Sequence, residues 1–185
     1  MNIVLASASP RRRELLTNLG ITFTTIPSDV DETKYIYDQP TEIAMRLALA
    51  KAQYVADKVT TSALIVGADT LIYKDELIGK PRDEEDAFDI LKKLQGTDHE
   101  VITGLAVVRS DDKKQKTTYE KTIVNMTSMS DNEIWEYIST GEPMDKAGAY
   151  AIQGSFVLLF LLVFVLVVFA FLPAYVLVLQ IVEPF

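Results

Sequence analysis

The sequence contains no cysteine and a single histidine among its 185 residues. Without cysteine the chain forms no disulfide and no thiolate metal site, and one histidine excludes a zinc site built from several histidines. An excess of basic residues is also missing, because 26 acidic residues stand against 18 basic ones and the net charge is −8. A chain of this charge does not attract duplex DNA through its overall field, so any anionic ligand needs a local basic cluster. We therefore expect no nucleic-acid partner.

The N-terminus lacks the long apolar stretch of a secretory signal, because Arg11, Arg12 and Arg13 interrupt it early. We expect a cytoplasmic protein on this ground.

Charge is nearly absent from the C-terminal end, where Glu183 is the sole charged residue after Gly154 and residues 156–172 are all apolar. This run approaches the length that spans a bilayer, but no Lys or Arg follows to anchor it. A buried hairpin is an alternative, although the run offers no Gly, Asn or Asp for a turn. Two hypotheses remain for 155–185: a segment that departs from the native sequence through a frameshift, or a membrane anchor. Despite this apolar segment, we expect that a membrane is not a partner of the protein.

Apolar patterns and capping signals alternate along the rest of the chain. Pro10 behind Ser9, Asp83, and the Ser130-x-x-Glu133 capping box each predict a helix start. The predicted helices begin at residues 10, 40, 83 and 130, and the predicted strands cover 2–6, 21–28, 63–70, 99–109 and 116–128, with a hairpin around 74–75. The pattern indicates a mixed α/β (α+β) protein with one domain over residues 1–185.

The stretch SASPRRRELL at 7–16 places Ser7, Ser9 and three arginines where a strand feeds a helix start. Unpaired N–H groups and the helix dipole favour an anion there, and arginine binds phosphate in bidentate fashion. We interpret this stretch as a phosphate site that uses Arg11 and Arg12. The alternative is a solvated helix face.

Three further residues are candidates for chemistry. Asp69 ends an apolar strand, where it could act as a general base, a metal ligand or a turn residue. Lys51 lies among Leu and Ala residues, and Lys80 lies between a glycine and a proline. Both lysines could bind a triphosphate or could be ordinary surface lysines with buried stems.

The acidic stretch of Asp29, Asp31 and Glu32 predicts either a divalent-cation site or a charged surface loop. His99 precedes a strand, and we interpret it as a hydrogen-bonding residue rather than a catalyst. We expect Trp135 in the core, since it lies in an amphipathic helix.

Several stretches together resemble one family. The resemblance rests on seven motifs in order: LASASPRRRELL, DVDE, LALAKA, VGADT, GKP, HEVITG and MDKAGAYAIQG. Their joint occurrence over residues 1–154 is similar to the Maf proteins, nucleoside triphosphate pyrophosphatases of the inosine-triphosphatase-like superfamily. The resemblance implies a central mixed sheet flanked by helices, with a cleft between two lobes. Residues 155–185 depart from the family pattern.

The resemblance also implies an activity, the hydrolysis of a nucleoside triphosphate to the monophosphate and pyrophosphate. By this resemblance, Asp69 of this chain matches the family's proton acceptor. The residues that match the family's positions around the phosphates are Ser7, Arg11, Arg12, Lys51 and Lys80. Arg12, Thr70 and Gln153 match the subgroup that acts on dTTP and UTP, with modified pyrimidine nucleotides as further substrates.

A divalent cation, Mg²⁺ or Mn²⁺, is implied by the same resemblance, with Asp31, Glu32 and Asp69 as the expected ligands. A homodimer is likewise implied. Two other functions stay open: a nucleotide-binding sensor that is tail-anchored to a membrane, and a regulator of cell division or septum formation.

Overall fold

The computed structural model describes residues 2–35 and 39–151, and it divides into two compact units. Within the described residues, unit 1 comprises 2–35, 39–69 and 103–120, and unit 2 comprises 70–102 and 121–151. Gln153 and the apolar segment 155–185 lie outside the described residues.

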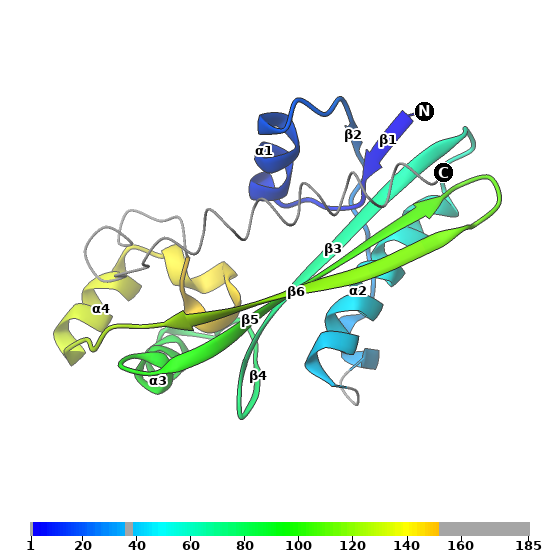
Figure 1. Cartoon of the computed structure of the whole chain (residues 1–185). Coiled ribbons are helices and arrows are strands. Elements are labelled where there is room, and N and C mark those ends of the chain that lie inside the picture. The colour runs from blue at the N-terminus through cyan, green and yellow to red at the C-terminus, as the bar shows by residue number, and fades with distance from the viewer. Residues whose placement is uncertain (1, 36–38, 152–185) are drawn as a thin grey trace. The chain divides into compact units, whose positions relative to one another are not determined.

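The described residues form a six-stranded mixed sheet in the order β2-β1-β3-β5-β6, with β4 paired to β3 (Figure 1). β1 pairs in parallel with both β2 and β3, whereas β4 is antiparallel to β3. The strands are β1 Asn2–Leu5, β2 Thr24–Thr25, β3 Ala63–Lys74, β4 Glu76–Ile78, β5 Asp98–Arg109 and β6 Gln115–Asn125. Parallel and antiparallel pairs in one sheet, with helices packed on it, confirm the predicted mixed α/β class.

Unit 1 has an apolar core on each face of its strands, because successive strand residues point to opposite faces. Val4 belongs to the core that packs on α2 (Pro40–Ala56), whereas its neighbour Leu5 belongs to the core that includes Leu16 of α1 (Pro10–Asn18). A short 3₁₀ helix, η1 (Glu32–Tyr35), precedes α2. The two helices therefore cover the two faces of this part of the sheet.

Small residues bring α2 unusually close to the strands. Ala44, Ala48 and Ala52 follow one another at every fourth position of α2, so they share one helix face, and none is exposed. A Cβ added at Gly67 of β3 would lie 2.2 Å from the Ala48 carbonyl oxygen, and one added at Gly104 of β5 would lie 2.1 Å from that of Ala44. The helix backbone thus lies directly against the sheet backbone.

Unit 2 packs two helices around its own core. These are α3 (Glu84–Leu94) and α4 (Asp131–Ser139), followed by the 3₁₀ helices η2 (Glu142–Asp145) and η3 (Ala147–Ala149). The helix starts are as predicted: the Asp83 side chain accepts from the Asp86 N–H at 2.8 Å, and Ser130 and Glu133 form the reciprocal capping box. Of the helices in the described part of the chain, none is long and apolar enough to cross a bilayer.

Three local expectations are wrong. β3 continues past residue 70 to Lys74, so Asp69 lies within a strand rather than at its carboxyl end. β2 has only two residues of the predicted 21–28. Trp135 is 41% exposed and stacks on the partly buried Phe88 at the edge of the core, with ring centroids 4.9 Å apart.

Candidate active site

The centre of the candidate site is an ion-pair triad in unit 1, made by Asp69, Lys51 and Glu32. Asp69 lies on β3 and is 6% exposed. Its Oδ1 accepts a short hydrogen bond from the Lys51 ammonium on α2, and the same ammonium lies 2.7 Å from a Glu32 carboxylate oxygen. Lys51 reaches Asp69 because the Ala48 and Ala52 turns of α2 lie against Gly67. Two carboxylates therefore converge on one cation.

Burial raises the pKa of Asp69 above its ordinary value, and the negative charge of Glu32 adds to the rise. The positive charges of Lys51 and Arg12 oppose it, and the net direction is upward. A carboxylate with a raised pKa is a better proton acceptor than an ordinary aspartate. The sequence leaves open whether Asp69 has a desolvated setting, and the structure provides one.

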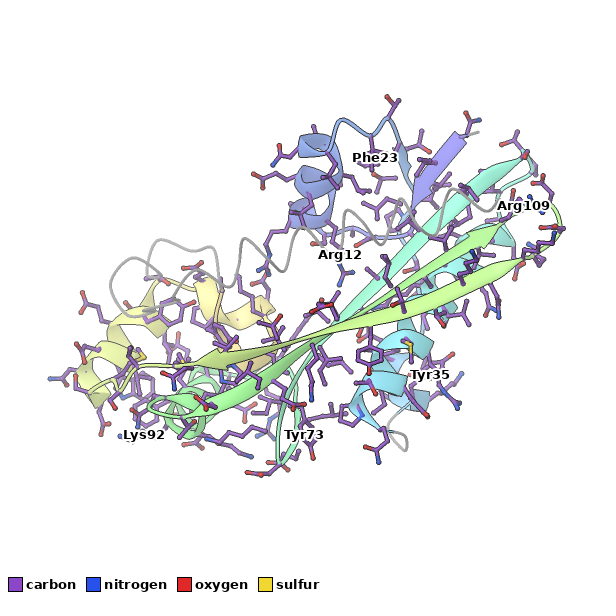
Figure 2. All side chains as sticks on the ribbon, in the orientation of Figure 1. Arg12, Phe23, Tyr35, Tyr73, Lys92 and Arg109 are labelled. Atoms are coloured by element: carbon purple, nitrogen blue, oxygen red, sulfur yellow. The ribbon has the colours of Figure 1, made fainter. Side chains whose placement is uncertain are left out.

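Arg12 lies beside the same strand. Its guanidinium donates to the carbonyl oxygen of Ala68 at 2.7 Å and to the Ser7 hydroxyl at 3.4 Å. Burial lowers the pKa of Arg12, although the charge of Asp69 opposes this. Figure 2 labels Arg12, whose side chain extends from the start of α1. Arg12 is therefore held against the backbone next to Asp69, in contrast to the solvated helix face considered as the alternative.

The loop before α1 is ordered by serine contacts. Ser7 is 6% exposed, and its hydroxyl oxygen accepts from the Ser9 N–H at 3.2 Å. Ser9 is the N-cap residue of α1, but its side chain makes no capping hydrogen bond. Arg11 is exposed, one position along the helix from the half-buried Arg12. The structure thus joins Ser7 and Arg12 to the Asp69 neighbourhood and leaves Arg11 on the surface of α1.

Within the acidic stretch of Asp29, Asp31 and Glu32, Glu32 is the residue that belongs to the triad. Asp31 is exposed, and its carboxylate accepts from the Thr33 hydroxyl at 2.6 Å and lies 3.5 Å from the Lys34 ammonium. Hydrogen bonds from Thr33 hold the pKa of Asp31 below its ordinary value. Asp29 is also exposed.

The site fits a divalent cation only with help from a substrate. Among the described residues there is no cluster of three or more His, Cys, Asp or Glu side chains suited to a metal. Asp69 and Glu32, however, already share one cation, the Lys51 ammonium. Mg²⁺ is commonly held by one or two carboxylates together with substrate phosphates and water, so this pair is a suitable donor set.

Three predicted site residues do not belong to the Asp69–Lys51–Glu32 triad. Thr70 is exposed and directly follows Asp69. Lys80 is exposed in the loop after β4 in unit 2. Gln153 lies outside the described residues.

Sequence reasoning missed the residues that set the spacing of the site. Gly67, Ala48 and Ala52 position Lys51. In the sequence, the alanine-rich helix face of 44–52 and the glycine two residues before Asp69 together indicate such a close helix–strand contact. The Ser28 hydroxyl also donates to the Ala6 carbonyl oxygen at 3.3 Å, which ties the loop after β2 to the end of β1.

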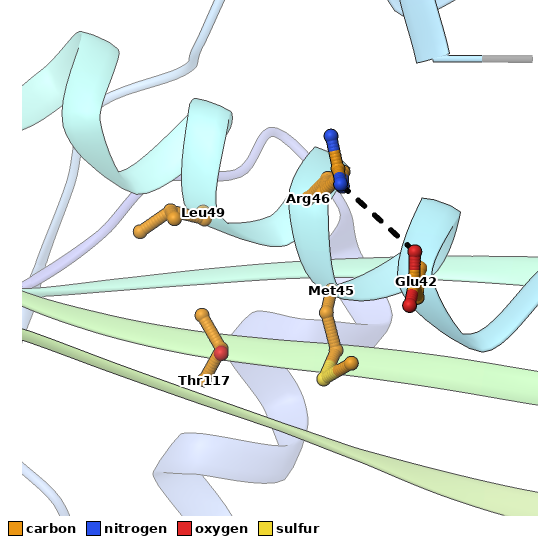
Figure 3. Close-up of a pocket in the computed structure, with 5 residues that line it drawn as sticks. All are labelled: Glu42, Met45, Arg46, Leu49 and Thr117. Carbon is orange, nitrogen blue, oxygen red and sulfur yellow. Dashed lines mark ion pairs between the residues drawn. The ribbon is translucent and has the colours of Figure 1, made fainter. Parts of the chain in front are cut away.

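A surface hollow in unit 1 is separate from these residues. It has a volume of about 210 Å³ and is lined by Glu42, Met45, Arg46, Leu49 and Thr117. Figure 3 shows the Glu42–Arg46 ion pair, 3.9 Å long, at this hollow. None of the predicted site residues lines it, so we do not assign it to the candidate site.

The chain is similar to known proteins over most of its length. It is 49% identical over 152 residues to a dTTP/UTP pyrophosphatase of Alkaliphilus metalliredigens, which covers 82% of this chain and 79% of that protein. It is also 49% identical over 155 residues to a dTTP/UTP pyrophosphatase of Thermoanaerobacter sp., covering 83% and 81%. A solved HAM1 protein from Coxiella burnetii aligns with a TM-score of 0.45 at 15% identity, covering 83% of this chain and 88% of that one.

The profile of the family described as "Maf-like protein" matches residues 2–162. This match covers most of the chain, and it includes the stretches that carry Ser7, Arg12, Lys51 and Asp69. The chain belongs to the Maf-like protein family.

Proposed function

We propose that the protein is a nucleoside triphosphate pyrophosphatase that hydrolyses dTTP and UTP to the monophosphate and pyrophosphate. The observation that carries the proposal is the buried Asp69 carboxylate, which is paired with the Lys51 ammonium and also experiences the positive charge of Arg12. The relatives that bear the name dTTP/UTP pyrophosphatase support this choice of substrates. A protein that only senses a nucleotide has no need of a buried carboxylate with a raised pKa, so we prefer the enzyme to the sensor.

In this proposal Asp69 is the general base. It orients a water and accepts its proton as the water oxygen attacks the α-phosphorus, and pyrophosphate leaves. The raised pKa of Asp69 brings the carboxylate closer to the range in which general bases work well. Lys51 keeps the carboxylate in place through the hydrogen bond to Oδ1.

The triphosphate carries several negative charges, which the overall charge of the chain does not neutralise. Ser7, Ser9, Arg11, Lys51 and Lys80 are the proposed phosphate-binding residues. Arg12 contributes positive charge beside Asp69 while its guanidinium stays on the Ala68 carbonyl oxygen. Positive groups of this kind stabilise the charge that develops on the transferring phosphoryl group.

Thr70 and Gln153 are proposed to select the pyrimidine substrate together with Arg12, as in the subgroup that the sequence resembles. A divalent cation, Mg²⁺ or Mn²⁺, would be held by Asp69 and Glu32, with Asp31 as a further candidate. When bound, such a cation neutralises phosphate oxygens and polarises the reacting centre. A homodimer stays part of the proposal, as the family resemblance implies.

The test is pyrophosphate release from dTTP, UTP, CTP, dATP, GTP and ITP with Mg²⁺ or Mn²⁺, for wild type and Asp69→Asn. We expect release from dTTP and UTP that Asp69→Asn abolishes. The matched control is Asp57→Asn, which removes a surface carboxylate paired with Lys113 at 2.7 Å and leaves the site intact. Folded wild-type protein that releases pyrophosphate from none of the six nucleotides would refute the proposal.

A further inference from the structure

A buried hydrogen bond in unit 2 joins two residues for which the proposed function gives no role, His99 and Tyr150. They are 3% and 5% exposed, and the His99 Nε2 lies 2.6 Å from the Tyr150 hydroxyl. The two rings pack edge to face, with centroids 5.4 Å apart. The other ring nitrogen, Nδ1, is buried and has no hydrogen-bond partner among the described residues. An unpaired buried nitrogen costs stability, so core packing alone does not explain a histidine at this position.

The hydrogen bond fixes the ring of Tyr150, and Tyr150 directly follows the tight turn of η3. Gly148 in this turn has φ +73°, and a Cβ added there would lie 2.4 Å from the Ile72 Cδ1 and 3.1 Å from the Tyr150 Cε1. The turn is therefore enclosed between β3 and the Tyr150 ring. A side chain at 148 would collide with Ile72 and crowd the Tyr150 ring, so a shift of the ring would disturb the turn.

The same turn holds the loop that carries Lys80. The Gly148 N–H donates to the carbonyl oxygen of Gly79 at 3.0 Å, and Gly79 immediately precedes Lys80. Pro81, on the other side of Lys80, is buried. Within the described residues the Lys80 ammonium is exposed and has neither a hydrogen bond nor an ion-pair partner. The loop backbone is thus fixed on both sides of a lysine whose charge is available to an anion.

We propose that His99 and Tyr150 are positioning residues for Lys80. They act through the η3 turn and its hydrogen bond to the Gly79 carbonyl oxygen, and they keep Lys80 in the place where it binds a substrate phosphate. The inference rests on the proposed function, since it deepens the phosphate-binding role given to Lys80. A cation fixed before the ligand arrives binds more tightly, because less freedom is lost on binding. His99 and Tyr150 touch no substrate in this proposal.

The hydrogen bond persists over the pH range in which an enzyme of this kind is assayed. Burial and the nearby positive charge of Lys74 lower the pKa of His99 to about 4, and Asp98 opposes the shift. Burial raises the pKa of Tyr150. Both groups are therefore neutral near pH 7, and protonation of His99 plays no part in the inference.

The experiment measures binding of inorganic tripolyphosphate to the full chain by calorimetry, with Mg²⁺ present, for Tyr150→Phe, Lys80→Met and the double variant. We expect Tyr150→Phe to weaken binding by about three- to tenfold, the effect of one buried hydrogen bond. In the Lys80→Met background the same change should have no further effect, since the positioned group is gone. In a nucleotide assay Tyr150→Phe should raise KM and change kcat less.

Two further variants separate positioning from general destabilisation. Ser130→Ala removes a side-chain hydrogen bond elsewhere in unit 2, the cap that the Ser130 hydroxyl forms by accepting from the Glu133 N–H, and it should not alter tripolyphosphate binding. His99→Gln keeps a hydrogen-bonding group near Tyr150 and should retain more binding than His99→Leu. The inference is overturned if Tyr150→Phe binds like wild type, if its effect is equal with and without Lys80, or if Ser130→Ala weakens binding as much.

Failure of this inference and failure of the proposed function give different results. A wild-type protein that binds tripolyphosphate through Lys80 but releases no pyrophosphate from any nucleotide refutes the function and retains the inference. A protein that hydrolyses dTTP, yet binds tripolyphosphate equally well as the Lys80→Met variant, refutes the inference alone.

Discussion

The substitution Gly67→Ala tests whether the contact between α2 and β3 sets the geometry of the site. The added Cβ would lie 2.2 Å from the Ala48 carbonyl oxygen and 2.9 Å from the Ala52 Cβ, where ordinary contacts begin at 3.4 Å. Two of the three neighbouring atoms belong to the helix backbone, which cannot rotate away. The helix must therefore withdraw from the strand by about 1 Å, since smaller side-chain adjustments do not relieve the overlap.

This displacement has a cost in stability and a separate cost in activity. Overpacking a core costs about 1–3 kcal/mol, and a clash with backbone belongs at the upper end. For a chain of this size, about 3 kcal/mol lowers the melting temperature by about 6–12 °C. Lys51 lies between Ala48 and Ala52, so the same movement draws its ammonium away from Asp69. A shift of about 1 Å at a catalytic group reduces the rate by up to about 100-fold.

The assay combines thermal unfolding, followed by circular dichroism, with pyrophosphate release from dTTP. Gly104→Ala is the matched control, because its Cβ would strike the carbonyl oxygen of Ala44, two turns along α2 from Lys51. We expect a similar loss of stability for both variants and a larger loss of activity for Gly67→Ala. A Gly67→Ala protein that melts within 2 °C of wild type and keeps full activity would refute the reasoning.

Two other predictions concern the pH dependence and the helix caps. In the proposed mechanism only the carboxylate form of Asp69 accepts a proton, so kcat/KM should be full above its raised pKa and fall about tenfold per pH unit below it, with the acid limb at higher pH than for an ordinary aspartate. Glu32→Gln should move this limb to lower pH and Lys51→Met to higher pH, in pH–rate profiles of the residual activity; the opposite order would contradict the electrostatic account. Ser130→Ala removes the side-chain cap of α4, whose hydroxyl also donates to the Glu133 carboxylate. In a denaturant titration this change should lower the free energy of unfolding by about 1 kcal/mol, and kcat/KM should not change.

Local signals predicted the helices well. Each predicted helix start coincides with a cap or a proline within one residue, because capping depends on side chains next to the helix end. The turn at residue 75 was also predicted, and Asp75 there has φ +59°. These features need no knowledge of distant residues.

Features that depend on distant residues were predicted less well. The VGADT stretch looked like the end of a strand, but pairing with neighbouring strands extends β3 to Lys74. Trp135 has helical spacing typical of a core residue, yet its partner Phe88 lies at the core edge, and no local pattern reveals this. The Lys51–Asp69 contact depends on a close helix–strand approach that only the fold creates.

The stack of Trp135 on Phe88 has a consequence for spectroscopy. Trp135 is the chain's single tryptophan and belongs to unit 2, so fluorescence excited at the tryptophan band reports on α3 and α4 alone. Circular dichroism, by contrast, averages over every helix and strand. If the two signals change at the same temperature, the units unfold as one cooperative body; if they separate, the order of the transitions identifies which unit is lost first. The protein thus carries its own reporter for one unit, and its lack of cysteine leaves any position in the other open to a uniquely placed thiol label.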